Sequence, residues 1–218
     1  MRLSFAFAHA LPLLFLAGCQ SAQAPAGKAA APTATAAPVA AAAAAANAAP
    51  AFIDRALGVS LAAVAGMQVH RDFARSYLDN GAWKAYAAPD SQGSPLVALV
   101  MDGSNHIITA ELRIGTSSDG AALRDCSAVP DSASPESTST VLLDGVAFRH
   151  FRAADAAMSH YMQVEGYRAV HQGRCIAIDL LLTGTNPDVY PEPPALPFTR
   201  AQAWEKLHEA LAAVHFTH

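Results

Sequence analysis

The nine histidines of this chain are the side chains best suited to bind a metal ion. A zinc site needs three or four converging ligands, often with two of them at helical or hairpin spacing. The chain contains neither a His-Glu-x-x-His nor a His-x-His motif. His160 and His171 flank one expected strand and are too far apart to share an ion unaided, although His150 could approach them from the preceding strand. We therefore predict ordinary histidines, no metal site and no cofactor.

No motif indicates nucleophilic catalysis by a serine. Such catalysis needs a serine within hydrogen-bond reach of a base that is itself oriented, and neither Gly-x-Ser-x-Gly nor Ser-x-x-Lys occurs. Asp155, Ser159 and His160 are close in sequence, but sequence proximity does not produce the geometry of a catalytic triad. The sequence therefore identifies no nucleophile.

Paired carboxylates are the remaining catalytic possibility. A glycosidase needs two of them flanking a cleft, and the candidates are Glu111 with Glu165 or with Asp179. Solvated surface positions explain these acids better. Phosphate-binding glycine loops are also absent from the sequence. No catalytic residue is assigned.

The N-terminus has the pattern of an export signal. Met1-Arg2 places a positive charge before an apolar stretch, Leu3–Leu16. A helix over these 14 residues would rise about 21 Å, which is short of a hydrocarbon core of roughly 30 Å. We expect residues 1–18 to be a signal peptide rather than a membrane span.

The four residues Leu16-Ala17-Gly18-Cys19 directly follow this stretch. They resemble the lipobox of bacterial lipoproteins, which implies cleavage before Cys19, attachment of palmitate-type chains to it, and anchoring to a membrane of the cell envelope. Several acyl chains on one residue give effectively permanent anchoring. Gln20 implies, by the same resemblance, the outer membrane facing the periplasm. The alternative is an ordinary signal peptide with an incidental cysteine.

Residues 19–50 are predicted to form a disordered linker. Between Gln20 and Pro50, 18 of 31 residues are alanine, four are proline and none is aromatic, so the segment cannot bury a core. It acts either as a simple tether or as a spacer that sets the distance between domain and membrane. The rest, residues 51–218, is expected to be a single domain.

The charge of this domain argues against nucleic acid as a partner. All 18 acidic residues and 12 of the 14 basic residues follow position 50, so the domain carries 12 − 18 = −6. Binding to phosphate backbones requires a basic surface. The expected partners are the membrane, through the lipid, and an envelope protein.

The three cysteines divide into one for lipid and two in the domain. An even remainder in an exported chain predicts a disulfide between Cys126 and Cys175. Its ring of about 49 residues would contribute roughly 4 kcal/mol in the chain-entropy model. Two buried thiols or a redox pair are the alternatives, although no Cys-x-x-Cys spacing supports redox chemistry.

Spacing and composition predict the secondary structure of the first part of the domain. Apolar residues three and four apart predict a helix over Phe52–Met67 and a second one over Asp72–Leu78. Strands are expected at Trp83–Ala88, Leu96–Met101, Ile107–Ile114 and Val146–Arg152, with a long loop over Gly115–Thr140.

The clearest hairpin joins His160–Val170 to Arg174–Thr183 through a turn at Gln172-Gly173. Direct pairing would place Glu165 and Gln163 in the core, which is costly unless both find partners. We therefore predict a bulge at Gly166 that brings Val164 and Met162 inward. Arg168 and Asp179 then share the other face and form a modest ion pair.

The C-terminal part is predicted as a loop followed by a helix. Gly184–Pro197 contains five prolines, which exclude a helix or a central strand. Thr199 and Gln202 form a capping-box pattern. An apolar stripe then predicts a helix with Trp204 buried against the sheet; its members are Ala203, Trp204, Leu207, Leu211 and Val214.

Together these elements predict an α+β fold: an antiparallel sheet of about five strands, packed by a C-terminal and an N-terminal helix mainly on one side. This plan is similar to PsbP/Mog1-type folds in element order alone, and the similarity transfers no function.

The expected function is a non-enzymatic binding or assembly domain on a membrane anchor. Its possible partner surface lies in the stiff 184–197 loop, at Asn186, Asp188 and Tyr190. The alternatives are an envelope hydrolase that places His150 or His160 beside an acid in a cleft, and a lipoprotein that binds a small ligand.

Overall fold

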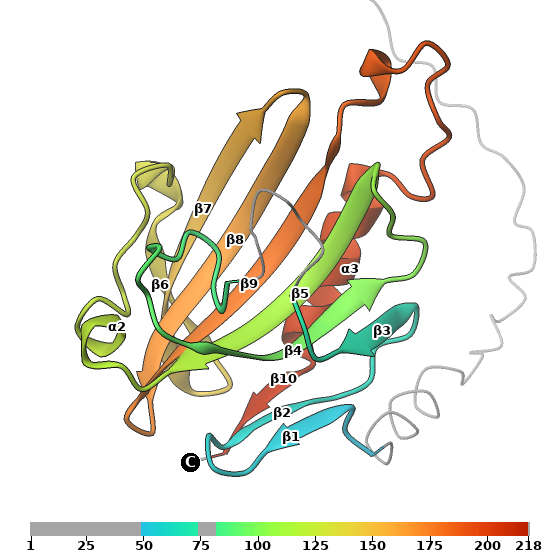
Figure 1. Ribbon diagram of the computed structural model, residues 1–218. Coiled ribbons are helices and arrows are strands. Elements are labelled where there is room, and N and C mark those ends of the chain that lie inside the picture. The colour runs from blue at the N-terminus through green and yellow to red at the C-terminus, as the bar shows by residue number, and fades with distance from the viewer. Residues whose placement is uncertain (1–48, 74–81, 218) are drawn as a thin grey trace, which may run out of the picture.

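The protein is α+β, and all its paired strands are antiparallel (Figure 1). The computed structural model describes residues 49–73 and 82–217, which form ten strands in two sheets, together with two helices. The predicted fold class is therefore confirmed. The expected signal peptide, Cys19 and nearly all of the expected linker lie outside the described residues.

The larger sheet has seven strands, where the sequence led us to expect about five. Their order is β3-β4-β5-β9-β8-β7-β6. Their bounds are β3 Met67–His70, β4 Ser94–Met101, β5 Ile108–Ser117, β6 Ser139–Leu143, β7 Val146–Ala157, β8 His160–His171 and β9 Arg174–Thr185. The prediction missed the two edge strands, β3 and β6, because both are short and mostly exposed, so neither shows a clear apolar pattern.

The predicted N-terminal helix is wrong, because two strands of the smaller sheet lie within its range. This sheet has the order β1-β2-β10, formed by Phe52–Asp54, Val59–Leu61 and Val214–Phe216. Gly58 turns the chain between β1 and β2 with φ of +60°, a conformation that suits glycine. The Asp54 carboxylate accepts the N–H of Leu57 at 3.0 Å and closes this turn. Apolar residues spaced three and four apart therefore belong to two short strands and a turn.

Three of the predicted strands are confirmed as β4, β5 and β7, of which β7 is longer than expected. The predicted strand at Trp83–Ala88 is wrong, because this segment forms bends and a turn in which Tyr86 has φ of +56°. The Trp83 ring lies so close to Gly93 that a Cβ there would be 2.3 Å from it. The predicted helix at Asp72–Leu78 falls largely on residues 74–81, outside the described residues.

The segment predicted as one loop, Gly115–Thr140, is more ordered than expected. It includes the end of β5, a short helix α2 at Gly120–Arg124, a 3-10 turn η2 at Pro135–Ser137, and the start of β6. Asp119 caps α2 by accepting two backbone N–H groups. The Ser, Asp and Pro residues that suggested a loop serve here as caps and turns.

The β8–β9 hairpin is confirmed, but the bulge at Gly166 is wrong. Pairing runs without a shift from His171 opposite Arg174 to His160 opposite Thr185. Glu165 and Gln163 therefore share the face of Tyr167. Gly166 serves a different purpose, because a Cβ there would lie 2.2 Å from the Phe151 ring of β7.

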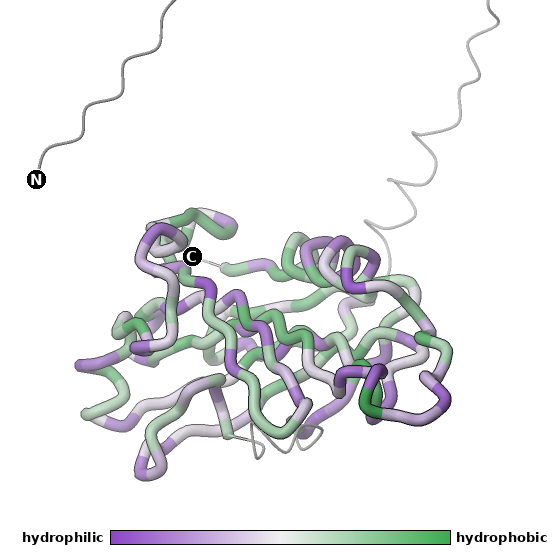
Figure 2. The backbone as a smooth tube through the Cα atoms, turned by 90° about the horizontal axis from the view of Figure 1, so that it is seen from above, coloured by the Kyte–Doolittle hydropathy of each residue, from purple (hydrophilic) through white to green (hydrophobic). Residues whose placement is uncertain are grey.

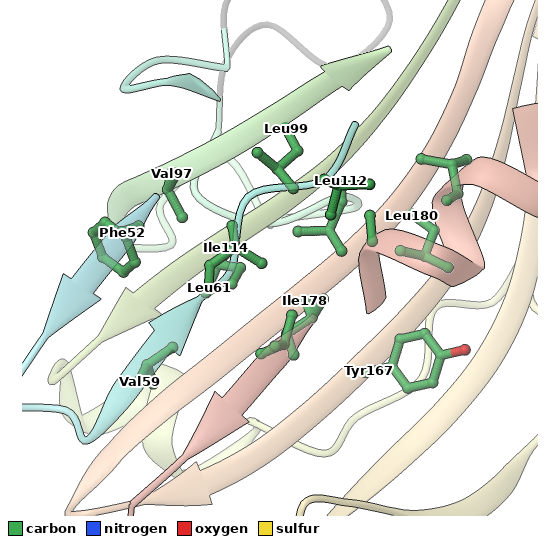
Figure 3. Close-up of a cluster of buried hydrophobic side chains, with 14 of the residues drawn as sticks. Phe52, Val59, Leu61, Val97, Leu99, Leu112, Ile114, Tyr167, Ile178 and Leu180 are labelled. Carbon is green, nitrogen blue, oxygen red and sulfur yellow. The ribbon is translucent and has the colours of Figure 1, made fainter. Parts of the chain in front are cut away.

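Helix α3, Arg200–Ala212, covers one face of the large sheet (Figures 1 and 2). The predicted capping box of Thr199 and Gln202 is present. Ala203 and Leu207 are buried, whereas Trp204 is only half-buried at the edge of the helix, so its predicted burial is partly wrong. Figure 3 shows the core beneath, where side chains such as Leu112 and Leu180 meet those of the small sheet.

Candidate functional site

A groove of about 440 Å³ lies between α3 and the strands β7 and β8. We call it the Glu165 groove. It is lined by Ser134, Arg152, Ala153, Ala154, Gln163, Val164, Glu165, Trp204 and His208. Helix α3 packs over β4, β5 and β9. The side of α3 that carries Trp204 therefore faces β8, and the helix leaves β7 uncovered. The groove exists for this reason.

Glu165 is the central acid of this groove, and three protein groups hold its carboxylate. Oε1 forms an ion pair with Nε of Arg152 at 2.7 Å. Oε2 lies 3.0 Å from Nε2 of His208 and 3.2 Å from the donating hydroxyl of Tyr167. These contacts explain why β8 needs no bulge, since a nearly buried acid is tolerated when it is paired and hydrogen-bonded.

The titration of Glu165 follows from the same contacts. Burial alone would raise its pKa, but the hydrogen bond from His208 and the charge of Arg152 outweigh burial, so the pKa lies below its usual range. The pKa of Tyr167 is raised, first by burial and then by the Glu165 charge. Glu165 is therefore an anion at neutral pH, and Tyr167 remains a protonated donor.

His150 lies beside this acid on β7. Its Nε2 is 3.8 Å from Oε2 of Glu165, its ring lies 4.7 Å from that of Tyr167, and its Nδ1 is 3.4 Å from the hydroxyl of Ser139. Burial lowers the pKa of His150 more than the Glu165 charge raises it. At neutral pH the ring is uncharged, and it could accept a proton from a group within hydrogen-bond reach.

Three polar groups of the groove remain open to a ligand. Arg152 is 60% exposed and uses only its Nε toward Glu165. No described residue accepts a hydrogen bond from its terminal nitrogens, from the side-chain amide of Gln163 or from the indole N–H of Trp204. The groove thus offers a cation, an amide and an aromatic wall around an acid that already has its partners.

The other predicted carboxylates lie on the opposite face of the sheet. Glu111 pairs with Arg113, and Asp179 pairs with Arg168 at 2.6 Å, and all four side chains are almost fully buried. The predicted Arg168–Asp179 ion pair is therefore confirmed. It is almost fully buried, whereas the sequence led us to expect only a modest ion pair. No pairing of Glu111 or Asp179 with Glu165 across a cleft exists, because the sheet separates them.

These buried pairs bind backbone groups of Phe73 and Ala85, two residues outside the strands. Asp179 accepts the N–H of Ala85 at 2.8 Å, and Arg168 donates to the carbonyl of Ala85 at 3.3 Å. Arg113 donates to the carbonyl of Phe73 at 2.8 Å. The charges therefore satisfy backbone groups of Phe73 and Ala85 that would otherwise be left buried and unpaired, which is a structural role.

Asp155, Ser159 and His160 do not converge on a triad. The Asp155 carboxylate accepts the N–H of Ala156, and Ser159 occupies the hairpin turn with φ of +70°. Nδ1 of His160 lies 3.0 Å from the hydroxyl of Thr185. His171, at the far end of β8, lies against the ring of Phe216. Of the histidines considered from sequence, only His150 lies beside the groove.

The predicted partner loop contains the 3-10 turn η3, Pro187–Val189. Asn186 caps this turn by accepting the N–H of Asp188 at 3.2 Å. Asn186 and Asp188 are exposed, and Tyr190 is half-buried. None of the three lines the Glu165 groove.

The disulfide predicted between Cys126 and Cys175 is present, with a Cα–Cα distance of 5.5 Å. It joins the segment after α2 to the start of β9, and both cysteines are buried with Trp83. The bond therefore ties the irregular 115–140 segment to the large sheet.

Arg152, Gln163, Trp204 and His208 were not identified as site residues from sequence. They come from β7, β8 and α3, so no local motif joins them. One signal was available: direct pairing of the hairpin places Glu165 on the core face, and a buried acid requires cationic or donor partners.

Residues 49–73 and 82–217 contain no group of three or more His, Cys, Asp or Glu side chains that could hold a metal ion. Over the same residues, no helix has the length and apolar character to cross a membrane. Comparison with protein-family models and with curated proteins finds no match to this chain.

Proposed function

We propose that this chain is a lipoprotein of the bacterial envelope, anchored through Cys19, whose domain binds a ligand or partner in the Glu165 groove without altering it chemically. The anchor is supported by Leu16-Ala17-Gly18-Cys19 behind an apolar stretch. Gln20 favours the outer membrane, with the domain in the periplasm.

The binding role rests on one observation: some polar groups of the groove hold Glu165, and others are left for a ligand. Glu165 is held by Arg152, His208 and Tyr167, whereas the outer nitrogens of Arg152 and the amide of Gln163, which also line the groove, have no hydrogen-bond partner among the described residues. Binding sites combine an apolar wall with a few convergent polar groups, and Trp204 supplies that wall.

Photocrosslinking in intact cells tests this proposal. A benzophenone amino acid replaces Gln163 in the full-length chain, and the matched control places it at Val170, which is 56% exposed on the same strand but outside the groove. We expect a discrete, light-dependent adduct from position 163 that weakens in the Arg152→Gln background. Equal adducts at both positions, or none, would contradict a binding role for the groove.

A second candidate, an envelope hydrolase, is favoured by one observation: His150 lies between the Ser139 hydroxyl and the Glu165 carboxylate. In such a mechanism Ser139 would attack an ester carbonyl while His150 takes its proton. Labelling with a fluorophosphonate probe tests it, with Ser139→Ala compared against the neighbouring Thr140→Ala. Labelling lost only in Ser139→Ala would favour the hydrolase over the binding module.

A further inference from the structure

We propose that the Glu165 groove binds a neutral saccharide, with one pyranose ring against Trp204 and the sugar hydroxyls on polar groups that the protein leaves without partners. The inference rests on the proposed function and deepens it by naming the ligand class. Three observations lead to it: the types of the open polar groups, the compensated charge of Arg152, and an aromatic wall.

The open polar groups come from different segments that meet at the groove. Arg152 on β7, Gln163 on β8 and Trp204 on α3 keep donors for which no described residue is an acceptor. Ser134 adds a hydroxyl: it is the N-cap residue of η2, yet its side chain makes no capping hydrogen bond, and it lines the groove. A hydroxyl and a carboxamide can each donate and accept. The hydroxyls of a saccharide do the same, so they match this mixed set.

The charge of the groove favours a neutral ligand. Arg152 lies with its Nε 2.7 Å from the Glu165 carboxylate, which compensates its charge, and His208 directs its Nε2 to the same carboxylate. The domain as a whole carries a net charge of −6, so its long-range field does not attract anions. Neutral hydroxyl and carbonyl oxygens can still accept hydrogen bonds from the terminal nitrogens of Arg152.

An aromatic wall lies on the α3 side of the groove. Trp204 is half-buried, and His208, four residues further along the helix, places its ring 6.0 Å from the indole. The faces of a pyranose ring carry C–H bonds, whose positive hydrogen atoms are attracted to the negative face of an aromatic ring. On β7 the groove is lined by the small side chains of Ala153 and Ala154. Its volume of about 440 Å³ lies within the range of small-molecule sites, roughly 300–1,000 Å³.

A small amphipathic anion is the main competing ligand. It would bind Arg152 and pack on Trp204, but its single polar end would leave the Ser134 hydroxyl and the Gln163 amide without partners. A saccharide carries hydroxyls around the whole rim of its ring and can reach polar groups on several sides of the groove. The combination of groups therefore favours a saccharide.

Binding of short oligosaccharides to the full chain carrying Cys19→Ser tests this assignment. A glycan array presents neutral oligosaccharides of glucose, galactose, mannose and N-acetylglucosamine beside acidic ones that contain uronic or sialic acid, and the best neutral binder is then titrated by calorimetry. Trp204→Leu, which keeps an apolar side chain, is compared with Trp204→Phe, which keeps an aromatic one. Gln163→Ala is compared with Gln92→Ala, an exposed glutamine outside the groove.

We expect a neutral oligosaccharide to bind with an affinity that does not change between low and high salt, since no net charge is exchanged. Trp204→Leu and Gln163→Ala should each weaken binding about tenfold, as for the loss of one good contact. Trp204→Phe should retain more affinity than Trp204→Leu, and Gln92→Ala should match the unsubstituted chain. Cosedimentation with cell-wall sacculi or with lipopolysaccharide vesicles distinguishes the two envelope sources, and competition by the bound oligosaccharide in either case supports the inference.

An array on which no neutral oligosaccharide is bound overturns the inference. Equal binding by Trp204→Leu and Trp204→Phe, or by Gln163→Ala and Gln92→Ala, does the same, and so does full competition by hexanoate, which would assign a small anion. Groove-specific photocrosslinks alongside any of these results would leave the groove as a binding site with another ligand, whereas failure of the photocrosslinks themselves removes the proposed function.

Discussion

At the scale of single residues, Glu165 is the acid around which the groove is arranged. It occupies a face of β8 that is otherwise committed to the core, and it stays there because Arg152, His208 and Tyr167 surround its carboxylate. Because the acid needs partners on a neighbouring strand and on a helix, the apolar packing between this strand and this helix is incomplete. The groove lies where the packing is incomplete, so the groove and the buried acid have the same cause.

The stability of the domain should fall on acidification through this cluster. Folding lowers the pKa of His150 from 6.5 and that of Glu165 from 4.5. Each group therefore stabilises the fold fully above its unfolded-state pKa and loses that effect as the pH falls through the lower folded-state pKa. Urea unfolding should show stability declining below about pH 6.5 and more steeply below about pH 4.5.

Glu165→Gln isolates the acid's part of this decline. We expect a loss of about 1–2 kcal/mol at pH 7, since hydrogen bonds to a charged group are removed, and a smaller difference from wild type at pH 4. Glu192→Gln, at an exposed position, is the matched control. A difference that stays constant between pH 7 and pH 4 would mean that the carboxylate charge does not stabilise the fold.

Gly166 makes a second prediction at this scale. A methyl group there would lie 2.2 Å from the Phe151 ring, so Gly166→Ala should destabilise the domain by about 1–3 kcal/mol. Phe151→Leu in the same chain should recover part of that loss. Gly120→Ala, whose added Cβ meets nothing closer than 3.5 Å, is the control in thermal unfolding, and an equal effect of both alanines would refute the steric explanation.

At the scale of elements, one covalent bond connects the least regular segment to the most regular strand pair. The Cys126–Cys175 disulfide joins residues 49 positions apart, and a ring of this size contributes about 4 kcal/mol in the chain-entropy model. Cys126→Ser should therefore lower the melting temperature under oxidising conditions. Wild type should approach the variant once a reductant is added, and a variant that melts with oxidised wild type would show that the bond adds nothing.

The elements also explain which predictions succeeded. Helix α3 was predictable because its capping box and apolar stripe are local, and so was the hairpin at Gln172-Gly173. The N-terminal strands were not, since Leu57, Leu61 and Val64 lie four and three residues apart, as on one face of a helix. Their partner, β10, is contributed by the end of the chain, at Val214–Phe216, and no local pattern reveals it.

At the scale of the whole molecule, the proposed anchor and the groove work together. A lipid at Cys19 would keep the domain at one membrane surface, and a linker of residues 19–50 would let it reach its ligand. Two-dimensional confinement raises the local concentration of tethered binding partners. A weak binding site in the groove would be useful under those conditions.

The anchor itself gives the prediction at this scale. Cys19→Ser should move the protein from the membrane fraction to the soluble periplasmic fraction, because the thiol that would carry the proposed lipid is gone. Cys126→Ser should remain with the membranes and serves as the control. Cys19→Ser protein that still sediments with membranes would mean that something other than this lipid holds it.

The sequence by itself determined the features that depend on local patterns, namely the α+β class, α3 with its cap and the main hairpin, and it determined the pairing of the two domain cysteines by their number. Tertiary structure decided the two extra edge strands, the unbulged register and the assembly of Arg152, His208 and Trp204 around Glu165. Burying an acid is favourable only when its partners are in place, and those partners lie on β7 and α3. The energy that selects the register therefore arises from contacts between distant segments.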